Sequence, residues 1–187
     1  MNAAVAQMGQ FYNLPVYNSS GLSDSKLPDI QARYEKGITG LAAALARANF
    51  THHSAGFLES MLTVAYEQYV IDDDINGAVM RAVRGIEVND ETLSLDLIEE
   101  VCHGEDHFLG TQQSLTLMNS EYYYPHTSDR QSRDNWAADG GLDMRERARM
   151  KAREILRLHR PEPIPAEIDA AIRERFEILL PPNLNTL

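Results

Sequence analysis

The sequence predicts an α/β fold in which two β/α units are followed by an all-helical region. Two short apolar runs, at residues 14–17 and 48–51, each end in a polar loop, as buried parallel strands do. A stretch with helical periodicity follows each loop. After Gly85 the strand-like runs give way to a series of helical patterns.

The first unit follows a helical segment at residues 4–12. Its strand, at 14–17, ends in the polar loop NSSG at 18–21. Pro28 suits the first turn of the next helix, and Asp29 complements the dipole of that helix. We expect this helix to bury one stripe of large apolar side chains, namely Ile30, Tyr34, Ile38, Leu41 and Leu45.

The second unit has its strand at 48–51, which leads into the loop HHSAG at 52–56. A long helix is expected directly after this loop, with an inner face made of Leu58, Met61, Leu62, Ala65, Tyr69 and Val70. The run Asp72-Asp73-Asp74 suggests a metal site, but neighbouring residues on a helix diverge by about 100°. A solvated helix end is therefore the interpretation we favour for this run.

The helical region contains four expected helices. The first is capped by Asn89 or Asp90 and ends near Gly104, and the second covers 111–120. A loop at 122–141 precedes a helix that runs from a capping box, Asp143 with Glu146, to about residue 159. Prolines 161, 163 and 165 separate it from a last helix at 166–179. We therefore divide the chain into β/α units at 1–85 and a helical extension of the same domain at 86–187.

Composition narrows the class of protein. The 187 residues carry a net charge of −11, which argues against a nucleic-acid binder because phosphate contacts need clustered Lys and Arg. No apolar run reaches the length of a membrane span, and the N-terminus lacks a basic leader, so we expect a cytoplasmic protein. Cys102 is the single cysteine, which excludes an intrachain disulfide and a cysteine-based metal cage. We interpret Cys102 as a small buried hydrophobe.

Several motifs, in order along almost the whole chain, resemble those of the trimethylamine methyltransferase family. They are GLSDSK-x-PD-x-QA-x-YEK (21–36), A-x-AN (46–49), AG-x-LES (55–60), YEQ-x-VIDD (66–73), RGI-x-V-x-DETL (84–93), HFLG (107–110) and PEP (161–163). Because independent motifs recur in the correct order, the resemblance is more specific than any single motif.

The resemblance implies a (β/α)₈ barrel of more than twice this length, of which the chain would form the last units and the C-terminal extension. It also implies transfer of a methyl group from a methylated amine to the cobalt of a corrinoid (cobalamin) carried by a separate protein, with no cofactor bound permanently to this chain. Founding members of the family use pyrrolysine in the active site. Relatives without it act on quaternary amines such as glycine betaine. Since the sequence contains no non-standard residue, a quaternary amine is the expected substrate.

Demethylation of a quaternary amine needs a site that holds a cation and orients one methyl group, rather than a site for proton transfer. Carboxylates and aromatic faces suit the cation, and polar groups suit a carboxylate tail. The candidates lie in and after the two strand-end loops. As catalytic residues we predict His52, His53 and Asp24, and as substrate-binding residues Asn18, Ser20, Glu59, Tyr66 and Glu67.

Each candidate also has a structural interpretation. Successive strand residues point to opposite faces, so at most one of His52 and His53 is expected to face a barrel site. Asp24 is also typical of a turn or a helix cap, and Asn18 and Ser20 of turns. Glu59 and Glu67, eight residues apart on the expected helix, would share a solvated face. Tyr66 fits a core position. The run Tyr122-Tyr123-Tyr124 fits a packed loop better than a contact surface for the corrinoid protein.

The sequence therefore predicts a corrinoid-dependent methyltransferase acting on a methylated or quaternary amine. It leaves open a truncated, inactive paralogue that serves as an assembly or partner-binding module, and a separately encoded or mispredicted fragment of a normal enzyme. A split enzyme would need a second polypeptide, or further copies of the chain, to supply the missing barrel strands.

Overall fold

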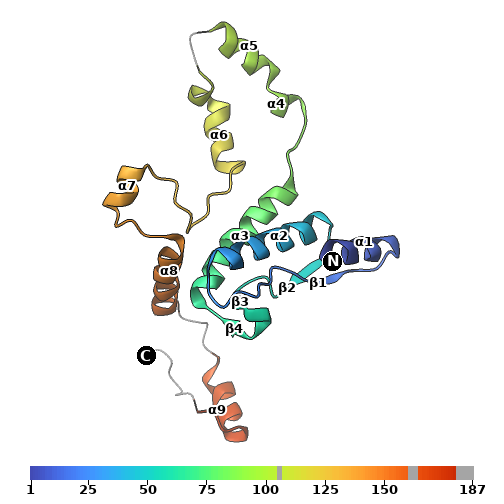
Figure 1. The fold of residues 1–187 in the computed structure, drawn as a ribbon, viewed down its shortest axis with the longest axis vertical. Coiled ribbons are helices and arrows are strands. Elements are labelled where there is room, and N and C mark those ends of the chain that lie inside the picture. The colour runs from blue at the N-terminus through green and yellow to red at the C-terminus, as the bar shows by residue number, and fades with distance from the viewer. Residues whose placement is uncertain (105–106, 160–163, 180–187) are drawn as a thin grey trace. The chain divides into compact units, whose positions relative to one another are not determined.

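A computed structural model describes residues 1–104, 107–159 and 164–179 (Figure 1). Over these residues the protein is mostly helical with a few short strands, which confirms an α/β fragment. The chain divides into two compact units, 1–152 and 153–187. The boundary between the units lies within helix α8 (Met144–Leu158).

The first unit begins with α1 (Asn2–Phe11), β1 (Tyr17–Ser19), α2 (Ile30–Leu45) and β2 (Phe50–His52). β1 and β2 lie side by side and pair in parallel, so the predicted β–α–β order is confirmed (Figure 1). Both strands start later than the apolar runs indicated. Pro15 has no amide to donate to a strand ladder, and the Val16 amide donates to the Asn49 side chain at 2.8 Å instead.

Helix α2 is oriented differently from the prediction. It begins at the N-cap Asp29, whose side chain accepts a hydrogen bond from the Ala32 amide, and Pro28 lies before the cap rather than in the first turn. The residues that α2 buries are Ala32, Lys36 and Ala43. The large apolar stripe is mostly exposed, with Ile30 at 81% and Ile38 at 64%, so the prediction that it is buried was wrong. Small side chains let α2 approach α1 and α3 (Tyr66–Arg84) closely.

Residues 57–64 form a hairpin rather than the start of a helix. β3 (Phe57–Leu58) pairs antiparallel with β4 (Thr63–Val64), and α3 begins only at Tyr66. The connecting turn η1 (Glu59–Met61) has φ values of 49°, 51° and 74°, which lie in the left-handed region and cannot continue a right-handed helix. Gly56, at φ +81°, reverses the chain before the hairpin.

The acidic run on α3 is not a solvated helix end, because Asp72 and Asp74 are both buried. Asp74 accepts hydrogen bonds from the His126 amide at 2.8 Å, the Thr127 amide at 2.7 Å and the Thr127 hydroxyl. It also accepts one from the Tyr123 hydroxyl at 3.3 Å. These contacts hold the segment 123–127 against α3. The solvated interpretation applies to the exposed Asp73 alone.

Tyr123 packs closely against α3. A side chain at Gly77 would lie 2.3 Å from the Tyr123 ring, so glycine is what lets the ring approach the helix. Burial, together with the nearby charge of Asp74, raises the pKa of Tyr123 to about 12. Tyr122 and Tyr124 are exposed, so the packed-loop interpretation holds for one of the three tyrosines.

The remaining helices follow the prediction in order but differ from it in several places. The last predicted helix, at 166–179, ends at Arg175. The first predicted helix is broken at Ser94, φ 53°, into α4 (Asp90–Leu93) and α5 (Leu95–His103). Cys102 on α5 is exposed, not buried, and α7 (Arg133–Ala138) occupies part of the predicted loop at 122–141. The other helical elements are η2 (Phe108–Gly110), α6 (Gln112–Ser120), α8 and, in the second unit, α9 (Ala166–Arg175).

The predicted cap of α8 is confirmed, since the Glu146 amide donates to the Asp143 carboxylate at 2.8 Å. Prolines 161 and 163 lie outside the described residues. Within the described parts of the chain, no helix is both long and apolar enough to cross a membrane.

Candidate functional site

One face of the β1–β2 pair carries a continuous row of aromatic rings, which runs from the first residue of each strand, Tyr17 and Phe50, to His52 at the carboxyl end of β2. The parallel register places Tyr17 opposite Phe50 and Ser19 opposite His52. The Tyr17 ring stacks on Phe50 at 5.2 Å between ring centroids and meets the edge of His52 at 4.0 Å. Three of the five rings, Tyr17, Phe50 and His53, are exposed. We call the five residues the ring row: Tyr17, Phe50, His52, His53 and Phe57.

His52 and His53 lie together instead of on opposite faces. Strand alternation ends at His52, and His53 adopts a φ of 61°, which turns its ring back towards its neighbour. The two ring centroids are 4.1 Å apart, and His53 contacts Phe57 at 5.2 Å. Burial, and then the positive charge that His53 can carry, lower the pKa of His52. The Nδ1 atom of His52 is enclosed and has no hydrogen-bond partner within the part of the chain that the structure describes.

The lowered pKa of His52 predicts how stability responds to acid. Between the folded-state pKa of His52 and its ordinary value of 6.5, the unfolded chain binds more protons than the folded chain, so stability falls as pH is lowered. We expect urea unfolding between pH 7.5 and 5 to show this loss. A His52→Phe variant, which keeps an aromatic ring, should lose this part of the pH dependence. An unchanged pH dependence in the variant would contradict the assignment.

A second group of predicted residues lies between the first loop and the hairpin turn. The exposed Asp24 accepts a hydrogen bond from the Ser60 hydroxyl, so it does not cap the helix. The Glu59 amide donates to the Ser25 carbonyl at 2.9 Å, and the Ser60 amide to the Ser23 carbonyl at 3.1 Å. The Glu59 carboxylate accepts from the Thr63 hydroxyl at 2.9 Å. The structure thus brings the loop that carries Asp24 against the hairpin turn that carries Glu59, although sequence reasoning had placed Glu59 on a helix.

Asn18 and Ser20 lie at the end of β1 and are both buried. The Asn18 side chain donates to the Asn2 carbonyl at 3.0 Å, and that of Asn2 donates to the Ser19 carbonyl at 2.9 Å. Asn18 therefore joins β1 to α1. The Ser20 hydroxyl is buried and has no hydrogen-bond partner among the described residues, which leaves it available to a polar group.

Tyr66 and Glu67, at the start of α3, do not join these residues. The Glu67 carboxylate is 3.3 Å from Arg149 and 3.5 Å from Arg145, both on α8. Burial raises the pKa of Glu67. Its own backbone hydrogen bond and the two arginines lower the pKa by more than this, so the net change is a decrease. Tyr66 is 66% exposed, so the core interpretation of Tyr66 was wrong. The expectation that Glu59 and Glu67 share a helix face was also wrong.

Sequence reasoning missed a buried ion pair behind the two loops. The Lys36 ammonium lies 3.1 Å from the Asp72 carboxylate, and both side chains are 1% exposed. Lys36 also donates to the carbonyls of Gly21 at 2.6 Å and Phe57 at 3.0 Å. Asp72 accepts from the Gly56 amide and the Gln68 side chain, each at 2.7 Å. The available signal was the small-residue face of α2, on which Lys36 lies between Ala32 and Ala43.

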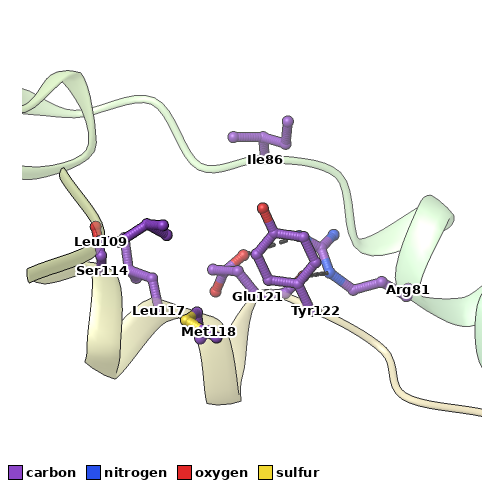
Figure 2. A pocket seen from close by; sticks show the side chains of 8 residues that line it. All are labelled: Arg81, Ile86, Leu109, Ser114, Leu117, Met118, Glu121 and Tyr122. Atoms are coloured by element: carbon purple, nitrogen blue, oxygen red, sulfur yellow. Dashed lines mark hydrogen bonds and ion pairs between the residues drawn. The ribbon is translucent and has the colours of Figure 1, made fainter. Parts of the chain in front are cut away.

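A separate groove of about 490 Å³ lies beside α6 (Figure 2). Arg81 donates to the Glu121 carboxylate at 2.9 Å at its edge. None of the residues that line this groove belongs to the strand-end loops: Arg81, Ile86, Leu109, Ser114, Leu117, Met118, Glu121 and Tyr122. The groove is therefore distinct from the ring row.

Comparison with known proteins decides the family. The model of the family described as Trimethylamine methyltransferase (MTTB) matches residues 1–177. The chain belongs to the trimethylamine methyltransferase family. It is 38% identical over 183 residues to trimethylamine methyltransferase MttB of Desulfitobacterium hafniense and 42% identical over 171 residues to MttB of Methanosarcina thermophila.

A glycine betaine methyltransferase of Desulfitobacterium hafniense is also similar to this member of the family, at 35% identity over 171 residues. These matches cover 95%, 90% and 91% of the chain but only 35%, 34% and 35% of the relatives. The chain thus spans about a third of the length of the curated relatives it matches.

Proposed function

We propose that the chain forms part of a methyltransferase that removes a methyl group from a quaternary amine of the glycine betaine type. Family membership supports the methyltransferase class. The observation that carries the substrate class is the ring row, which offers aromatic faces and imidazoles along one face of two parallel strands. Ligand sites of open α/β sheets lie beyond the carboxyl ends of the strands, which is the end of the row that carries His52 and His53.

The ring row suits a quaternary ammonium group because such a cation has no N–H to donate and is held by aromatic faces. The lowered pKa of His52 favours its neutral imidazole, which reduces repulsion of the cation. Asp24 and Glu59 would add negative charge to the loops that follow the two strands, where Asp24 accepts from the Ser60 hydroxyl and Glu59 from the Thr63 hydroxyl. The Ser20 hydroxyl, which has no partner among the described residues, would suit the carboxylate of the substrate.

In this reaction the carbon–nitrogen bond breaks and its electron pair stays on nitrogen, so the leaving tertiary amine is neutral and needs no proton. A corrinoid carried by a partner protein would supply the nucleophile that accepts the methyl group. Tyr17, Phe50 and His53 are exposed, so one side of the proposed site is open to solvent. A partner protein could approach the site from this side. The task of the chain is to hold the cation, orient one methyl group and exclude water.

Under the same proposal, residues 1–85 form the last β/α units of a (β/α)₈ barrel, and residues 86–187 form a helical extension of that domain. Both parts would correspond to the C-terminal portion of the relatives. The remaining strands of such a barrel would correspond to the part of the relatives that the chain does not match. A cytoplasmic location is part of this proposal.

A second candidate is a catalytically inactive module that binds a partner. The exposed apolar stripe of α2, including Ile30 and Ile38, favours it, since surfaces of this kind often mark interfaces. Under this alternative the chain would form a stable species on its own and would not turn over methylated amines.

The test supplies methyl-labelled glycine betaine and a reduced corrinoid protein to the chain, alone and after co-expression with the adjacent gene. We expect dimethylglycine to form in at least one preparation, and a Tyr17→Leu change to reduce its rate by about two- to fivefold, within the range of a cation–π contact at an exposed site. A Tyr122→Leu variant, outside the ring row, is the control. Absence of dimethylglycine in both preparations would favour the inactive module.

A further inference from the structure

The proposed site depends on two loops that meet at a single buried point. The first loop follows β1 and contains Gly21, and the second follows β2 and contains Ser54. A side-chain carbon at Gly21 would lie 2.9 Å from the Ser54 backbone, so the loops are in close contact. The positions of the site residues on either side of this contact therefore depend on how firmly the two loops are fixed.

Lys36 and Asp72 bind both loops at this point. Lys36 donates to Gly21 in the first loop and to Phe57 at the end of the second, at 2.6 and 3.0 Å. Asp72 accepts from Gly56, the neighbour of Phe57, at 2.7 Å. One ion pair between α2 and α3 therefore fixes three backbone groups of the loops, and Phe57 itself belongs to the ring row.

The pair is poorly explained as a stabilising contact. Burial raises the pKa of Asp72, and the attraction of Lys36 and the hydrogen bonds to Asp72 offset this only in part. Buried ion pairs commonly contribute no more stability than apolar residues of similar size. A pair that adds little stability but aligns three loop groups is better explained by the geometry that it imposes.

We propose that Lys36 and Asp72 are positioning residues. Through the two loops, they fix the position of the ring row relative to the contact between Asp24 and Ser60. This inference rests on the proposed function for the identity of the ligand, but the arrangement of the loops is measurable without any ligand.

The test compares wild-type chain with the double variant Lys36→Met/Asp72→Leu, which replaces the ion pair with apolar side chains and keeps a filled core. Amide exchange is measured at Glu59 and Ser60, whose amides bind the first loop but touch neither substituted side chain. We expect both amides to lose protection by about tenfold or more in the double variant, and the contact between the His53 and Phe57 rings to disappear from NMR spectra.

A Lys26→Met variant is the matched control, because Lys26 is exposed in the first loop and donates only to the nearby Asp24 carbonyl. If a double variant of wild-type stability retains both the exchange protection and the ring contact, the pair is merely structural and the proposal is overturned. Weak protection of Glu59 and Ser60 in the wild-type chain would overturn it equally.

Titration with glycine betaine separates this proposal from the function on which it rests. If the wild-type chain binds the ligand, the double variant should bind it at least about tenfold more weakly, as expected for lost preorganisation. If the wild-type chain does not bind it, the proposed function fails, and the exchange and ring-contact measurements still decide whether Lys36 and Asp72 position the loops.

Discussion

Replacing Asp72 with alanine is expected to lower the free energy of unfolding by about 3–5 kcal/mol, the cost of leaving a buried charge without its partner. Lys36 would keep its charge in a site where its side chain is 1% exposed. The Gly56 amide and the Gln68 side chain would also lose their acceptor. Urea unfolding at pH 7, monitored by circular dichroism, measures the change.

Asp73→Ala is the matched control for this change, because Asp73 lies next to Asp72 on α3 but is exposed. We expect it to alter stability by less than about 0.5 kcal/mol, as surface substitutions usually do. The Lys36→Met/Asp72→Leu double variant should recover most of the lost stability. Equal effects of Asp72→Ala and Asp73→Ala would show that the ion pair is not formed in solution.

The second large effect is expected at Asp74. Its carboxylate accepts hydrogen bonds from the His126 and Thr127 amides and from the Thr127 and Tyr123 hydroxyls. Asp74→Ala would leave several buried donors unpaired, at a cost of about 1–3 kcal/mol for each buried donor that water does not reach. We expect segment 123–127 to detach from α3, with rapid amide exchange at His126 and Thr127.

The pH dependence provides an independent check. Burial raises the pKa of Asp74, but the hydrogen bonds from Thr127, His126 and Tyr123 outweigh it and hold the pKa below 3.8. Because the folded-state pKa is depressed, the stabilisation is complete above pH 3.8 and is lost as pH falls through the folded-state value. An Asp74→Asn variant should lack this acid-dependent step, and persistence of the step would contradict the assignment.

The sequence was informative where structure depends on local pattern. The parallel β–α–β order, the Asp143 cap and the order of family motifs could all be predicted, since turns, caps and hydrophobic runs act over a few residues. The hairpin at 57–64 could not, because its apolar spacing also fits a helix. The left-handed φ angles of Glu59, Ser60 and Met61 and the antiparallel pairing of β3 with β4 distinguish the two.

The site was harder to predict because it depends on tertiary contacts. The His52–His53 contact arises from a positive φ at His53 that strand alternation does not anticipate. Lys36 and Asp72 are far apart in sequence and are charged, so neither pattern nor composition indicated that both are buried. The wrong prediction of which face α2 buries has the same cause. The sequence pattern favours the large apolar stripe, whereas tertiary contacts bury the small-residue face.

The measurement that tests the central claim most directly is an NMR titration of the chain with glycine betaine and with 3,3-dimethylbutanoate, which has the same shape but no positive charge. The account predicts that glycine betaine shifts the ring signals of His52, His53 and Tyr17, and that the isostere, which keeps the carboxylate but lacks the ammonium charge, binds about two- to thirtyfold more weakly. Equal binding of the two compounds, or shifts confined to residues outside the ring row, would contradict the account.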